Sequence, residues 1–83
     1  MSVNKENIKI ILGLKLKQAR KEQKLSLAKL SEKSGLSISY LNEIEKGKKY
    51  PKPEKIYALA TALGLNFDEF VSLKLEKRLS PLS

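Results

Sequence analysis

The 83-residue sequence contains no cysteine and no histidine. Without thiols it can form neither a disulfide nor a thiolate metal site, and without imidazole it lacks the commonest general base at neutral pH. It also has no glycine-rich phosphate loop and no grouping of acids around a nucleophile. We therefore expect no metal and no cofactor, and an enzyme is the weakest functional hypothesis.

Long hydrophobic runs are missing as well. The apolar run at residues 10–12 ends at Gly13 and Lys15, far short of a signal-peptide core or a membrane span. The alternation of apolar and polar residues that is typical of strands is also absent. These features predict an all-α, cytoplasmic protein with no membrane contact, and the length allows one domain.

Positive charge exceeds negative charge, mostly in the first half of the chain. The formal net charge is +8. Residues 1–50 hold twelve Lys and Arg against five Glu, whereas residues 51–83 hold five against four acidic residues. Such a surface suits the phosphates of a nucleic acid, although lysines also keep a small domain soluble. Charge alone does not separate these two interpretations.

Residues 25–47, LSLAKLSEKSGLSISYLNEIEKG, predict two short helices joined by a tight turn. The helices cover 27–34 and 38–46, and each follows a serine, Ser26 or Ser37, whose hydroxyl can accept a free backbone N–H of the first turn. A glycine follows each helix, where a positive φ ends it readily. This order of caps, helices and glycines is the pattern of a helix-turn-helix.

The second of these helices has two different faces. Leu41 and Ile44 lie on one side with Glu45 at its border, which predicts docking on a scaffold. The residues on the other side are mostly small or polar, so this side does not dock on the scaffold and can face a partner molecule. That stripe consists of Ile38, Ser39, Asn42, Glu43 and Lys46.

Three more helices are expected around this unit. Apolar residues recur at helical spacing over residues 7–23, where Gly13 would permit close packing against a neighbouring helix. Pro53 suits the first turn of the fourth helix, which Gly64 ends, and Asn66 can cap a fifth. We expect Phe67, Phe70, Val71 and either Leu73 or Leu75 to close the core. We therefore expect a flexible segment over residues 1–6, a domain over 7–76 and a frayed tail over 77–83.

The chain resembles the DNA-binding domain of the phage-repressor-like helix-turn-helix family, of the lambda Cro and C1 or XRE type. The resemblance covers roughly residues 8–72 without a gap. It rests on Leu12, Gly13, Leu16, Arg20, Leu25, Ser26, Leu30, Gly35, Ser37, Leu41, Ile44, Glu45, Gly47, Pro51 and the run IYALATALGL at 56–65. The resemblance implies a compact five-helix bundle that binds operator DNA through helix 38–46 in the major groove.

The same resemblance implies roles for single residues. The base-contacting positions fall on Ile38, Ser39 and Glu43, with Asn42 close by. Ser39 can donate or accept, Glu43 can accept from a cytosine amino group, and Ile38 can contact a thymine methyl. The alternatives are that Ile38 packs inward and that Glu43 is an ordinary exposed charge, which would repel phosphate.

Phosphate contacts are expected around the start of the same helix and in the loop that follows it. Five lysines lie within residues 46–55, beside two prolines that keep the loop irregular. The alternatives are a solvated linker and, for the tyrosine, a role in covering the core. The expected contacts are Ser37, Tyr40, Lys46, Lys48, Lys49 and Lys52.

Two further implications of the family concern Arg20 and Leu27. Arg20 is expected to form an ion pair with Glu45, which ties the first helix to the recognition helix; the alternative is a solvated arginine of little effect. At position 27 the family commonly has Gln, which helps to hold a phosphate, so this sequence departs from the pattern there.

The resemblance implies a sequence-specific transcriptional regulator, a repressor, that binds a two-fold symmetric double-stranded DNA operator as a homodimer. The chain is either complete or accompanied by additional domains or a partner protein. The alternative on the same fold is an antitoxin or a protein-interaction adaptor, which Leu27 favours and the lysine-rich loop opposes. RNA binding is less favoured, because few aromatic residues are available for stacking.

Overall fold

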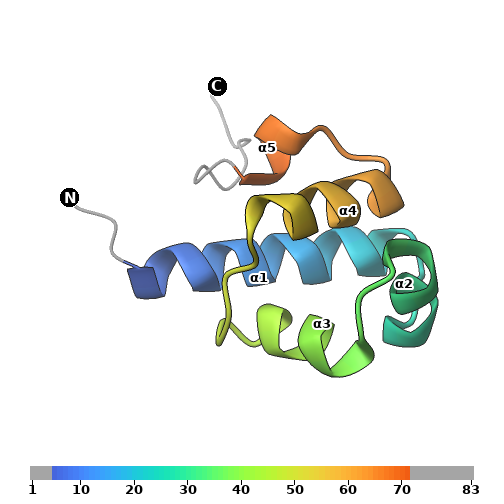
Figure 1. Ribbon diagram of the computed structural model, residues 1–83, viewed down its shortest axis with the longest axis horizontal. Coiled ribbons are helices and arrows are strands. Elements are labelled where there is room, and N and C mark those ends of the chain that lie inside the picture. Colours follow the sequence, from blue (N-terminus) through green and yellow to red (C-terminus); the bar gives the residue numbers. More distant parts are fainter. Residues whose placement is uncertain (1–4, 72–83) are drawn as a thin grey trace.

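A computed structural model describes residues 5–71. This part consists of five α-helices and contains no strand, which confirms the expected all-α class (Figure 1). The helices are α1 (Lys5–Glu22), α2 (Leu27–Ser34), α3 (Ile38–Glu45), α4 (Pro53–Leu63) and α5 (Phe67–Val71).

The helix boundaries differ from the expected ones at a few places. The first helix begins at Lys5, two residues before the expected start. Residues 1–4 of the expected flexible segment lie outside the described residues. The helix α3 ends at Glu45, one residue before the expected end, and Lys46 forms its C-cap. Leu73, Leu75 and the expected tail lie outside the described residues.

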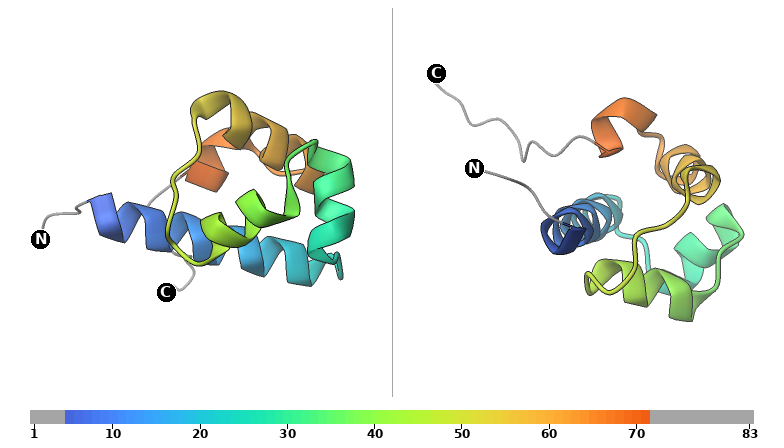
Figure 2. Two further views of the ribbon diagram at one scale, coloured as in Figure 1. Left: turned by 60° about the horizontal axis from the view of Figure 1, so that its bottom comes forward. Right: turned by 60° about the vertical axis from the view of Figure 1, so that its left-hand side comes forward.

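The longest helix, α1, supports the other elements. It packs against α3 on one side and α5 on the other, while α2 contacts both α3 and α4 (Figures 1 and 2). The buried apolar side chains come from all five helices and form one cluster. Its members are Leu12, Leu16, Ala19, Leu30, Leu36, Leu41, Ile44, Ile56, Leu59, Ala60, Leu63 and Phe70.

The expected caps are present at the helix starts. Ser26 Oγ accepts a hydrogen bond from Lys29 N at 3.0 Å, and Ser37 Oγ accepts one from Tyr40 N at 3.1 Å. At the start of α5, Asn66 Oδ1 accepts from the backbone N–H of Asp68 at 2.8 Å. These bonds satisfy donors that have no partner inside the helices, and they fix where each helix begins.

Gly13 allows α1 and α3 to approach closely. A Cβ atom at this position would collide with the carbonyl oxygen of Ile44 and would lie 3.0 Å from that of Glu45. Both neighbours are backbone atoms of α3, which cannot rotate away as a side chain would. The glycine therefore allows α3 to lie close against α1.

Candidate nucleic-acid interface

The turn between α2 and α3 is held by polar bonds around one buried residue. Leu36 is 9 % exposed and joins the core. Its N–H donates to Ser34 Oγ at 3.2 Å, and its carbonyl oxygen accepts from the Ser31 hydroxyl. With Gly35 at a φ of +79°, these contacts fix the angle at which α3 leaves α2.

The two faces of α3 are separated as the pattern predicts. Leu41 and Ile44 are fully buried. Ile38 is 48 % exposed, so it lies on the open side of the helix. Ser39 is exposed as well, while Asn42 and Glu43 are partly exposed. The structure thus brings the four expected base-contacting residues onto an accessible face.

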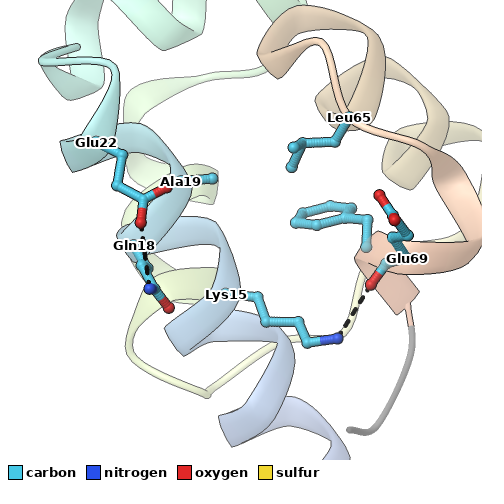
Figure 3. A pocket seen from close by; sticks show the side chains of 7 residues that line it. Lys15, Gln18, Ala19, Glu22, Leu65 and Glu69 are labelled. Carbon is cyan, nitrogen blue, oxygen red and sulfur yellow. Dashed lines mark hydrogen bonds between the residues drawn. The ribbon is translucent and has the colours of Figure 1, made fainter. Parts of the chain in front are cut away.

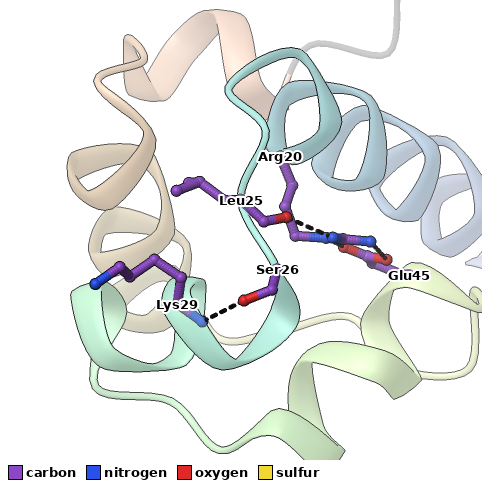
Figure 4. Close-up of polar contacts among 5 residues, drawn as sticks. All are labelled: Arg20, Leu25, Ser26, Lys29 and Glu45. Atoms are coloured by element: carbon purple, nitrogen blue, oxygen red, sulfur yellow. Dashed lines mark hydrogen bonds and ion pairs between the residues drawn. The ribbon is translucent and has the colours of Figure 1, made fainter.

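An ion pair between Arg20 and Glu45 links α1 to α3 (Figure 4). Arg20 Nε donates to Glu45 Oε2 at 2.7 Å, and Nη2 donates to Oε1 at 3.1 Å. The remaining terminal nitrogen, Nη1, donates to the carbonyl oxygen of Leu25 at 2.7 Å. The side chains are only 12 % and 6 % exposed, so the alternative of a solvated arginine does not describe this contact.

The guanidinium therefore joins three segments at one point: the end of α1, the chain entering α2, and the end of α3. Its planar fork matches the two carboxylate oxygens, an arrangement that fixes direction as well as distance. The hydrogen bonds to Glu45 raise the pKa of Arg20 above its ordinary value, and partial burial opposes this shift. The pair holds α3 in a defined orientation on its scaffold.

The segment after α3 is a structured turn. Gly47 adopts a φ of +77°, and Lys48 N donates to the carbonyl oxygen of Glu43 at 2.9 Å. This bond spans the helix end in the manner of a Schellman motif. Pro51 is fully buried and fixes the far side of the turn. Lys46 and Lys48 stay exposed on this ordered turn.

Two of the expected contact residues are paired with each other. Lys49 Nζ lies 3.2 Å from Glu43 Oε1 and 5.7 Å from the centroid of the Tyr40 ring. Tyr40 is partly buried and packs against the core, so it covers the core and carries the lysine at the same time. Glu43 is thus not an isolated charge on the open face.

A polar hollow of about 450 Å³ lies beside the start of α3. Three expected phosphate-contacting residues line it, namely Ser37, Tyr40 and Lys52. The hollow is also lined by Lys55, which was not among the expected contacts, and by Glu54, whose carboxylate partly offsets the two lysines. The signal that could have found Lys55 is spacing, because positions 52 and 55 lie one turn apart at the beginning of α4.

Leu27 faces the protein interior to a considerable extent. It is partly buried and packs against the core cluster. The departure from the family pattern at this position therefore adds a packing contact. Because the side chain is partly buried, it offers a partner protein less apolar surface than a fully exposed leucine would, which weakens its support for the adaptor.

A second hollow, between α1 and α5, is too small for an organic ligand (Figure 3). Its volume of about 160 Å³ lies below the roughly 300 Å³ at which ligand pockets begin. Lys15 Nζ crosses its mouth and donates to the carbonyl oxygen of Glu69 at 3.0 Å. Partial burial lowers the pKa of the Lys15 ammonium, and the Glu69 carboxylate opposes this shift.

Two kinds of site are absent from residues 5–71, namely a membrane-spanning helix and a metal-binding cluster. No helix in this range is both long enough and apolar enough to cross a membrane. Within the same range, no three of the residue types that commonly hold a metal ion lie close together.

Comparison with known sequences supports the helix-turn-helix. The profile described as helix-turn-helix matches residues 16–70. The chain is 34 % identical over 67 residues to the HTH-type transcriptional regulator SutR of Escherichia coli K12, covering 81 % of this chain and 38 % of that protein. It is 40 % identical over 60 residues to the immunity repressor protein of Bacillus phage phi105, covering 72 % of this chain and 42 % of that protein.

Solved structures show the same arrangement of helices. The restriction-modification controller protein C.AhdI from Aeromonas hydrophila superposes with a TM-score of 0.72 at 32 % identity, covering 75 % of this chain and 94 % of that one. A transcriptional regulator from Vibrio cholerae gives 0.77 at 28 % identity, covering 81 % of this chain and 38 % of that one. The match therefore covers about two fifths of the length of the two sequence relatives. It covers nearly all of the C.AhdI chain.

Proposed function

Because the chain belongs to the helix-turn-helix family, we propose that it is a sequence-specific DNA-binding transcriptional regulator that inserts α3 into the major groove. The observation that carries the proposal is the open face of α3, which is presented by a rigid scaffold and bordered by lysines. An α-helix with its side chains is about 10 to 12 Å in diameter, so it fits a major groove of about 12 Å width.

Within this proposal the base-contacting residues are Ile38, Ser39, Asn42 and Glu43. Ile38 offers an apolar surface to a thymine methyl, while Ser39 and Asn42 can donate or accept at base edges. The Glu43 carboxylate accepts only, which matches the amino group of cytosine. These contacts supply sequence preference.

Phosphate contacts flank the helix on both sides in this proposal. In the hollow beside the start of α3, a phosphate would contact Ser37, Tyr40, Lys52 and Lys55. The first backbone N–H groups of the helix also favour an anion there. At the other end of the helix, phosphate is contacted by Lys46 and Lys48. Such contacts fix the register of the protein on the duplex without reading its sequence.

We further propose that the regulator acts as a homodimer on a two-fold symmetric operator. One copy of an eight-residue helix touches too few base pairs to define a unique site, and two copies about one helical turn apart double that number. The similarity to a phage immunity repressor supports repression as the mode of action. We propose residues 7–76 as the DNA-binding unit. The regulator would act in the cytoplasm and would have no catalytic role.

The test is selection of bound sequences from a random duplex library at near-physiological salt, followed by salt titrations on the selected site and on a scrambled one. We expect an enriched two-fold symmetric sequence that binds at least about a thousandfold more tightly than the scramble. A variant with Ser39→Ala and Asn42→Ala is the matched control, because it keeps the lysines and should lose most of that preference. Equal, salt-sensitive binding of both duplexes would contradict the proposal and leave only general charge attraction.

A further inference from the structure

Lys49 lies back against the recognition helix. Its Nζ is 3.2 Å from Glu43 Oε1 and 5.7 Å from the centroid of the Tyr40 ring. Tyr40 and Glu43 are three residues apart on α3, so their side chains are neighbours on one face. The lysine therefore bridges two consecutive turns of the helix that is proposed to enter the groove.

The backbone after α3 determines this placement. Gly47 N donates to the carbonyl oxygen of Ile44 at 3.0 Å, and Lys48 N donates to that of Glu43 at 2.9 Å. These bonds reverse the chain direction at the helix end and return residue 49 to the level of Glu43. The buried Pro51 then holds the segment from its other side. Lys49 and Lys48 are thus placed differently, although they are adjacent and carry the same charge.

The pair changes what Glu43 can do on the open face. An uncompensated carboxylate in this position would repel the phosphates that line the groove. The ammonium of Lys49 offsets that charge locally. It binds Oε1, so Oε2 keeps its lone pairs and can accept from a cytosine amino group. The second contact, with the Tyr40 ring, restricts the lysine and so restricts the direction of the carboxylate.

We propose that Lys49 is a positioning residue for base recognition, which holds and neutralises Glu43 so that this carboxylate reads one base pair of each half-site. Lys48, by contrast, contacts phosphate. The inference rests on the proposed function, because base reading presupposes DNA binding. It replaces the phosphate contact that the sequence suggested for Lys49 with a contribution to specificity.

The experiment is library selection with the full chain and with five variants: E43A, K49A, the double variant, K49R and K48A. Affinities are then measured on the selected site and on duplexes changed at single positions. We expect E43A and K49A to lose discrimination at the same base pair by about 5- to 10-fold. The double variant should lose no more than either single variant, because the two residues act as a unit. Arginine keeps the charge and the ring contact, so K49R should retain the preference.

K48A is the matched control, since it removes an adjacent lysine of equal charge. It should weaken binding to all duplexes alike and reduce the slope of log affinity against log salt by about one. If K49A behaves in this way while E43A alone alters a base preference, Lys49 is a phosphate contact and the inference is wrong. Unchanged preferences in E43A would also overturn it. Failure of the unsubstituted chain to enrich any sequence would instead overturn the proposed function, and the inference with it.

Discussion

Lys24 has a backbone conformation that residues other than glycine rarely adopt. Its φ is +58°, and it is exposed between α1 and α2. Lys24 N donates to the carbonyl oxygen of Lys21 at 2.9 Å, and Leu25 N donates to that of Arg20 at 3.0 Å. These bonds form the helix-ending turn in which glycine is usually found, so a side chain occupies a place where it costs free energy.

Lys24→Gly should therefore stabilise the protein by up to about 1 kcal/mol, because glycine adopts positive φ without the clash of a Cβ atom. The measurement is the free energy of unfolding from denaturant titration. Lys24→Ala is the control: it removes the same long side chain but keeps the Cβ, and it should leave stability within about 0.5 kcal/mol of the parent. Equal stabilisation by both substitutions would contradict the conformational explanation.

Capping residues predicted where helices begin, and the apolar periodicity over residues 7–23 predicted the end of α1 to within one residue. Ser26, Ser37 and Asn66 were expected as caps because each carries a side-chain acceptor before a helical pattern, and each makes the expected bond. No residue type marks the end of α1, since Lys24 resembles an ordinary helix residue. Tertiary hydrogen bonds hold the chain in place at this helix end. One of them is donated by Gln23 Nε2 to the carbonyl oxygen of Leu63 at 2.6 Å.

At the scale of elements, the position of α3 depends on its contacts with α1. The Arg20–Glu45 pair is mostly shielded from water, so removal of one partner leaves the other charge poorly compensated. Glu45→Ala should destabilise the fold by about 2 to 4 kcal/mol, near the lower part of the range for buried pairs because Arg20 keeps its bond to Leu25. Thermal or denaturant unfolding measures this loss.

Glu43→Ala provides the comparison for that substitution. It makes the same change on the same helix, but its ion pair with Lys49 has side chains that are 40 % and 53 % exposed. Exposed pairs contribute less than about 1 kcal/mol, so this variant should unfold close to the parent. If the two variants proved equally stable, the Arg20–Glu45 contact would have no special role in holding α3.

The contact between Lys49 and Glu43 was not predictable from the sequence. Both residues were expected at the interface, but in separate roles. Gly47 indicates a turn after α3, but no residue type indicates that this turn brings the Lys49 side chain back to Glu43. By contrast, the resemblance to a known family suggested Arg20 and Glu45 as partners although they lie far apart in the chain.

At the scale of the whole molecule, the proposed DNA surface combines α3 with the start of α4. Lys52→Ala and Lys55→Ala should each reduce the slope of log affinity against log salt by about one, with a nearly uniform loss across DNA sequences. Titration of binding to the selected duplex between low and near-physiological salt gives the slope. The control is Lys21→Ala, an exposed lysine of α1 outside the proposed surface. A slope unchanged in both α4 variants would remove the hollow from the interface.

The division of α3 into two faces has a consequence for how such a protein can acquire new targets. The residues that hold the helix in place, Leu41, Ile44 and Glu45, are different from those on its open face. The outward side chains can therefore be exchanged, by mutation or by design, with little effect on folding. Glu43 differs from the others in its contacts, because its ion-pair partner, Lys49, lies in the segment after the helix. A transplanted recognition surface should carry positions 43 and 49 together, as a single inherited unit.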